Sequence, residues 1–161
     1  MSGNDAPQAL YLKLIKMTSF GAFTNEVVGP FSPHLNVVFG SNEAGKTTLA
    51  SFVGGVLFGW EEARGNRNTY KPLNAERSGS LFFARDHIGD ADEPNGSNEF
   101  GDAEEIELAR TKNADGLVGD ASLVADIDKE TFQTMFSLTS DELRSLRNTT
   151  DVTAKLLTAG S

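Results

Sequence analysis

Cysteine is absent from the chain, so neither a disulfide framework nor a cysteine zinc site is available to it. Histidine is scarce, and His34 has no second histidine or carboxylate cluster at ligand spacing beside it, so we interpret it as a turn residue. No apolar run approaches the roughly 18 residues of a membrane-spanning helix. Residues 1–8 are polar and lack the apolar stretch of a signal peptide. We therefore expect a cytoplasmic protein without a membrane partner.

Basic residues are outnumbered by acidic ones, and the formal net charge of −9 at first disfavours nucleic acid as a partner. The acids are unevenly placed, however. Residues 86–105 hold eight of them and no lysine or arginine, which leaves the rest of the chain close to neutral. We interpret this Gly- and Asn-rich acidic stretch as a long flexible loop between two strands. The net charge therefore says little about the other surfaces.

One segment fits the pattern G-x-x-x-x-G-K-[ST] of a Walker A phosphate loop. Its glycines allow backbone angles that let successive N–H groups converge on one anion, and the helix that follows turns its positive end toward that anion. The lysine would reach the β- and γ-phosphates, and the hydroxyl of Thr47 would enter the shell of a Mg²⁺ ion. The predicted nucleotide-binding residues are Gly40, Ser41, Asn42, Glu43, Ala44, Gly45, Lys46, Thr47 and Thr48.

The context of this loop supports the prediction. Residues 35–39 form a short apolar run of strand length that ends directly on Gly40. After the loop, apolar residues recur at helical spacing and predict a helix over residues 46–58. Gly54 and Gly55 lie inside this helix and predict a close approach of its backbone to the sheet. A glycine turn without a ligand would not need both a lysine and a threonine at these places.

The rest of the chain predicts one domain over residues 10–161, preceded by a disordered tail at residues 1–9. Asp128 is the expected N-cap of a helix over residues 129–136, and Thr139 opens a capping box. Strands are expected at residues 10–17, 23–28, 35–39, 80–85, 105–110 and 117–123, and further helices at residues 139–146 and 150–157.

Two other features are candidates for chemistry. Residues 61–77 form a polar loop that contains Arg64, Arg67 and Arg77, which could extend toward a γ-phosphate or DNA; a solvated loop is the alternative. Asp126 follows a short apolar run, as a magnesium-binding acid does in P-loop enzymes. The run is short and a helix start follows at once, so the pattern is a weak match.

The phosphate loop and several segments around it resemble those of a known family. The string from Gly40 to Thr48, with Asn42 in third place, resembles the loop of SMC, SbcC and RecF ATPases, and the fuller string is similar to the AAA domain of YhaN-like proteins. The same resemblance covers residues 57–59, residues 132–138 with 141–144, and the strand that ends in Arg110. SMC and SbcC proteins place a glutamine near the position of Ser140, and this chain departs from them there.

The resemblance implies an α/β fold: a P-loop NTPase N-terminal lobe, an ABC-type half head with a mixed sheet and an antiparallel β-layer. It implies ATP with Mg²⁺ as cofactors. The implied partners are a C-terminal lobe of the same protein reached through a coiled coil, a second head as dimer partner, and DNA as a candidate. The family's signature motif and Walker B acids have no counterpart in this sequence, so we expect no catalytic residue within it and no turnover by the chain alone.

We therefore interpret the chain as the ATP-binding N-terminal half of an SMC/SbcC-like ATPase head, acting in DNA repair or chromosome maintenance. Two alternatives stay open. One is a self-contained P-loop kinase or other NTPase, which predicts an arginine-rich lid and a catalytic acid near residue 125. The other is a non-catalytic scaffold in which a relic loop only stabilises the fold. Nucleotide binding distinguishes the scaffold from the first interpretation.

Overall fold

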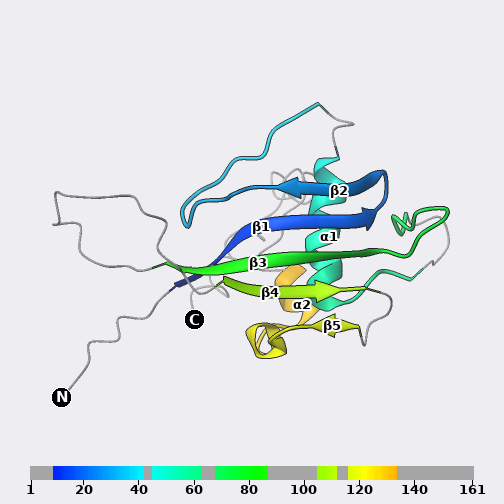
Figure 1. Cartoon of the computed structure of the whole chain (residues 1–161). Coiled ribbons are helices and arrows are strands. Elements are labelled where there is room, and N and C mark those ends of the chain that lie inside the picture. Colours follow the sequence, from blue (N-terminus) through cyan, green and yellow to red (C-terminus); the bar gives the residue numbers. More distant parts are fainter. Residues whose placement is uncertain (1–8, 42–44, 63–67, 87–104, 112–115, 134–161) are drawn as a thin grey trace, which may run out of the picture. The chain divides into compact units, whose positions relative to one another are not determined.

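The structure, a computed structural model, describes residues 9–41, 45–62, 68–86, 105–111 and 116–133. It divides into two compact units, Met1–Ala121 and Ser122–Ser161, which are described separately. The first unit contains a five-stranded sheet and one long helix (Figure 1). No helix in the described ranges is long and apolar enough to span a bilayer.

The sheet has the strand order β2-β1-β3-β4-β5, and each neighbouring pair is antiparallel. Side chains alternate across it as the pleat requires: Ile15 and Met17 of β1 are buried, whereas Lys16 between them is exposed. Figure 1 shows the strands side by side in this order. Their bounds are β1 Ala9–Phe20, β2 Phe23–Val28, β3 Ser78–Asp86, β4 Glu105–Arg110 and β5 Leu117–Val118.

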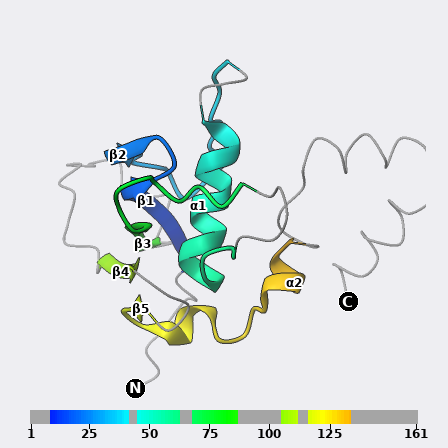
Figure 2. The same ribbon diagram turned by 90° about the vertical axis from the view of Figure 1, so that its right-hand side faces the viewer.

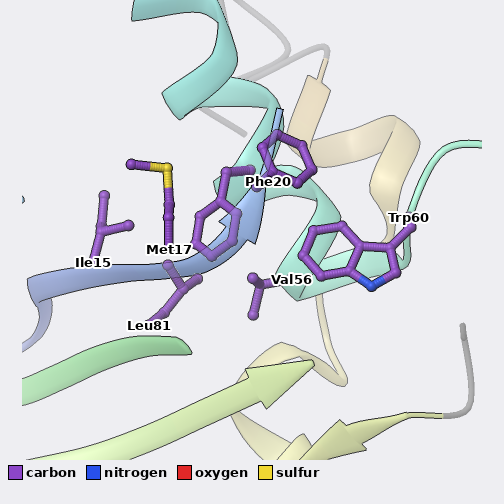
Figure 3. Close-up of a cluster of buried hydrophobic side chains, with 7 residues drawn as sticks. Ile15, Met17, Phe20, Val56, Trp60 and Leu81 are labelled. Carbon is purple, nitrogen blue, oxygen red and sulfur yellow. The ribbon is translucent and has the colours of Figure 1, made fainter. Parts of the chain in front are cut away.

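Helix α1 (Lys46–Phe58) lies on one face of this sheet (Figure 2). Phe52 and Val56, one turn apart, face the strands and are fully buried, as is Leu81 of β3. The aromatic rings of Phe20, Phe52 and Trp60 contact one another at centroid distances of 5.3–5.8 Å. The core cluster, drawn in Figure 3, comprises Ile15, Met17, Phe20, Phe52, Val56, Trp60 and Leu81.

The helix 46–58 and the strand 23–28 have the predicted bounds. The strand 105–110 does as well, and β1 and β3 extend the predicted strands at both ends. The sequence prediction of 117–123 as a strand is wrong beyond Val118, because residues Ala121–Val124 form the 3-10 helix η1. β1 also begins one residue inside the tail expected at residues 1–9.

The predicted strand at residues 35–39 is not a strand in the structure. A strand needs a neighbour for its N–H and C=O groups, and this run pairs with none of the five strands. Asn36 instead folds back on the preceding turn: its amide group donates to the carbonyls of Ser32 and His34 at 2.8 and 2.9 Å. The described sheet is therefore wholly antiparallel, and the parallel part of the expected mixed sheet is not formed by the described residues.

In the second unit, Asp128 caps the short helix α2 (Lys129–Thr131), as predicted. Its carboxylate accepts hydrogen bonds from the backbone N–H and the hydroxyl of Thr131 at 2.8 and 2.9 Å. These bonds favour the charged form and lower the pKa of Asp128. Several predictions concern segments outside the described residues. These are the helices at residues 139–146 and 150–157, Ser140, and most of the acidic loop.

Candidate functional site

Helix α1 begins at a glycine. Gly45 is its N-cap, with φ at 90° in the left-handed region, and this residue has no side chain that could cap the helix. The first turn contains no acidic residue. By helix geometry, the N–H groups of the first turn have no partner inside the helix. An anion is the ligand that such a helix end favours.

Gly45 is also held by packing against β2. A Cβ atom built on Gly45 would lie 2.4 Å from Cζ of Phe23 and 2.8 Å from Cε2 of the same ring. The ring of Phe23 therefore occupies the place of the missing side chain. The phosphate-loop motif explains the glycine at this position by its backbone angles. The packing of Phe23 against it could not be predicted from the local sequence.

Lys46 turns back over the start of its own loop. Its Nζ donates hydrogen bonds to the carbonyl oxygens of Gly40 and Ser41, the second at 2.8 Å. The side chain is nonetheless exposed, so the ammonium can exchange these carbonyls for a stronger acceptor. The loop is thus drawn toward the helix N-terminus by its own lysine.

The two threonines after the lysine differ in exposure. Thr47 is exposed, whereas Thr48 is half-buried beside the turn between β1 and β2, where a Cβ on Gly21 would lie 3.3 Å from its methyl group. Thr47 is therefore the hydroxyl that a bound ion could reach. Of the predicted site residues, Gly40, Ser41, Gly45, Lys46, Thr47 and Thr48 gather at this end of α1, and Asn42, Glu43 and Ala44 lie outside the described residues.

Arg77, the arginine of the polar loop that lies within the described residues, is held by hydrogen bonds within the fold. Arg77 donates to the carbonyls of Glu61 and Thr69 at 2.7 and 2.9 Å, and its guanidinium lies 5.7 Å from the centroid of the Trp60 ring. Burial lowers the pKa of Arg77, and nearby glutamates partly offset the effect. Of the two alternatives for this loop, an arginine directed toward a phosphate or DNA therefore does not hold for Arg77. Arg64 and Arg67 lie outside the described ranges.

Metal-binding clusters do not occur among the described residues, where no group of three or more His, Asp or Glu side chains could hold an ion. Asp126 is exposed in the short segment before α2, and His34 is exposed in the turn that Asn36 holds. A magnesium ion at Thr47 would therefore take its other ligands from phosphate and water, which is how this ion is usually bound.

A cavity of about 520 Å³ opens beside the loop and has mainly apolar walls. Leu49 and Val53 of α1 line one wall, and Leu12 and Ile15 of β1 line another. Lys46 stands at the end that meets the phosphate loop. Sequence patterns did not predict this cleft, because it forms between segments that are distant in the chain.

Comparison with known proteins then identifies the family. The family model for an AAA domain matches residues 10–161, nearly the whole chain. The chain belongs to the AAA domain family. Membership makes it an AAA-type ATP-binding domain.

Solved structures support the fold of this AAA domain. A chain from a study of ATP-driven dimerization and DNA-stimulated activation of SMC ATPases matches with a TM-score of 0.56 and 17% sequence identity. The match covers 91% of this chain and 96% of that chain. At that identity the likeness shows that the two chains share a fold. No curated protein matches the chain.

Proposed function

We propose that this AAA domain binds Mg-ATP at the N-terminus of α1, as the N-terminal half of an SMC/SbcC-like ATPase head. The observation that carries the proposal is the first turn behind Gly45, where the N-cap glycine offers no side chain to the N–H groups and Lys46 is exposed beside them. Backbone N–H groups and one ammonium would hold the β- and γ-phosphates, and the hydroxyl of Thr47 would hold the ion. Asn42, Glu43 and Ala44 would complete the loop.

Hydrolysis, in this proposal, needs groups from a partner. Phosphoryl transfer depends on positioning a water molecule and on neutralising the developing charge. The described residues would supply the phosphate-binding side, and they include no cluster of acids for the other side. We infer that a C-terminal lobe and a second head complete the site, that the lobes are joined through a coiled coil, and that the chain alone does not turn over ATP.

Two apolar surfaces support the docking of such a lobe. Leu35 and Phe39, in the run that precedes the loop, are 89% and 90% exposed. Leu49 and Val53 of α1 are half-buried against the core cluster and also line the cleft. A neighbouring strand would pair with residues 35–39 and give them the parallel partner that they lack. The function of the assembled head would be DNA repair or chromosome maintenance.

A scaffold with a relic loop is the second candidate. The observation that favours it is the pair of hydrogen bonds from Lys46 to its own loop, which satisfy the ammonium without a nucleotide. In that case the loop stabilises the fold and binds nothing.

Titration of the ¹⁵N-labelled chain with Mg-ATP tests the proposal. We expect the amides of Gly45, Lys46 and Thr47 to shift, and Lys46→Ala to abolish the shifts while the fold is kept. Lys71→Ala removes an exposed lysine paired with Glu76 and is the matched charge control; it should bind as the wild type does. Unchanged amides at millimolar Mg-ATP would favour the scaffold.

The magnesium site has its own comparison. Thr47→Val replaces the hydroxyl by a methyl group of similar size at an exposed position. It should leave the stability unchanged and remove the gain in ATP affinity that Mg²⁺ brings, whereas Thr47→Ser should keep that gain. If Thr47→Val responds to Mg²⁺ as the wild type does, Thr47 is not the metal ligand.

A further inference from the structure

Hydrogen bonds that run in both directions connect the C-terminal end of α1 with the end of β4. Nε of Arg110 donates to the carbonyl of Val56 at 2.8 Å. Nε1 of Trp60 donates to the carbonyl of Thr111 at 3.2 Å. We call these four residues the clasp. Val56 and Trp60 also belong to the core cluster in Figure 3, so the clasp is continuous with the packed interior.

Arg110 places a positive charge at the C-terminal end of α1. The last carbonyls of a helix have no partner within it, and they carry the negative end of the helix dipole. The last turn of α1 has no basic residue of its own. Arg110 supplies the cation from another element, with Nη2 also 3.5 Å from the carbonyl of Leu57. The side chain is 3% exposed, so solvent weakens this interaction little.

The two ends of α1 therefore differ in whether a charged side chain compensates the helix dipole. The clasp compensates the C-terminal end with a buried guanidinium, whereas the N-cap Gly45 has no side chain and the first turn of the helix contains no acid. The helix has 13 residues, which at 1.5 Å per residue separate the two ends by about 20 Å. A helix of this length transmits a tilt or slide at one end to the other, because its own hydrogen bonds keep it rigid.

We propose that Arg110 is a positioning residue for the phosphate loop. By fastening the C-terminal carbonyls of α1 to β4, it fixes how far the N–H groups of the first turn stand from the edge of the sheet where Phe23 meets Gly45. Arg110 touches no nucleotide in this proposal. The expected effect of Arg110 on nucleotide affinity rests on the proposed function. The expected effect of Arg110 on the position of α1 does not require a nucleotide.

The test uses three variants of the full chain. Arg110→Met removes both the charge and the hydrogen bonds at similar length. Arg110→Lys keeps the charge but lacks the planar fork that can reach two carbonyls. Leu108→Val is the matched control, since it trims a fully buried side chain two residues away on β4 and leaves the clasp intact. All are compared at a temperature where denaturation curves show them folded.

Two readouts are measured on each variant. Without nucleotide, Arg110→Met should shift the amides of Thr47, Thr48 and Leu49, and Leu108→Val should not. With Mg-ATP, Arg110→Met should raise the Kd by about threefold to tenfold, with Arg110→Lys between it and the wild type. Lys71→Ala, which removes one charge elsewhere, should leave the Kd unchanged. Trp60→Phe, which keeps a ring and loses the other bond, should move both readouts in the same direction by less.

The outcomes separate this proposal from the proposed function. If Arg110→Met leaves the three amides where the wild type has them, or if Leu108→Val moves them equally, the positioning role is wrong. If the wild type binds no Mg-ATP, the proposed function fails, and the amide comparison without nucleotide still decides whether Arg110 positions the first turn of α1.

Discussion

Gly45 is the residue at which backbone geometry, packing and the proposed chemistry meet. Its φ of 90° lies in the left-handed region, which costs a residue with a Cβ atom roughly 1–2 kcal/mol. The ring of Phe23 independently excludes a Cβ atom there. The two requirements can be separated, because only the second depends on a neighbouring side chain.

We expect Gly45→Ala to lower the free energy of unfolding by about 2–4 kcal/mol, the sum of backbone strain and overpacking against Phe23. In a Phe23→Ala background the same change should cost only about 1–2 kcal/mol, because the strain remains and the clash is gone. Urea denaturation of the four proteins of this double-mutant cycle gives both values. Equal costs in the two backgrounds would mean that Phe23 does not pack on Gly45 in solution.

At the scale of elements, α1 contains two adjacent glycines in unlike surroundings. A Cβ atom on Gly55 would lie 2.5 Å from Cε3 of Trp60, so the close approach expected from the sequence exists, but with an aromatic ring rather than with the sheet. A Cβ atom on Gly54 would meet nothing within 4 Å. The same substitution one residue apart therefore tests how Trp60 is packed.

Gly54→Ala should raise the free energy of unfolding by about 0.5–1 kcal/mol, since alanine favours the helix and meets open space. Gly55→Ala gains the same helix propensity but must displace Trp60, and we expect a net loss of about 1–3 kcal/mol. Thermal and urea denaturation measure both. Equal stabilisation by the two variants would show that Trp60 does not rest on α1.

Elements that depend on local patterns could be predicted from the sequence. The helix 46–58 follows from apolar spacing, and the cap at Asp128 follows from residue type; both are found in the structure. The run at residues 35–39 was predicted as a strand from the same kind of pattern and is not one. An apolar run specifies a preference for extended backbone, but a strand exists only where a partner pairs with it.

The candidate site also combines residues that a local motif predicts with contacts that local patterns cannot predict. The motif predicts Lys46 and Thr47 because it places them next to each other, and their role at the site stays a prediction. The contacts of Gly45 with Phe23 and of Arg110 with Val56 join residues that lie far apart in the chain. A signal for Arg110 did exist: it shares the alternating face of β4 with buried Leu108, and a charge on a buried face needs partners.

At the scale of the first unit, the described residues contain one buried core cluster, and the apolar residues of the run 35–39 are largely exposed beside it. Leu35, Val37 and Phe39 are 89%, 74% and 90% exposed. Several large apolar side chains so close together and so exposed are typical of a surface that another chain covers. Leu73 is also fully exposed, but it is single and has no such neighbours. It provides a control for simple surface hydrophobicity.

We expect the double variant Leu35→Ser with Phe39→Ser to keep the free energy of unfolding within about 0.5 kcal/mol of the wild type, because neither side chain is buried. The same variant should bind less of a hydrophobic dye and self-associate less in sedimentation at high concentration, because the shared apolar surface is gone. Leu73→Ser should change neither. If the double variant instead loses stability as a core substitution does, about 2 kcal/mol or more, residues 35–39 are packed within the chain in solution. The docking of a further lobe on them would then have no surface to use.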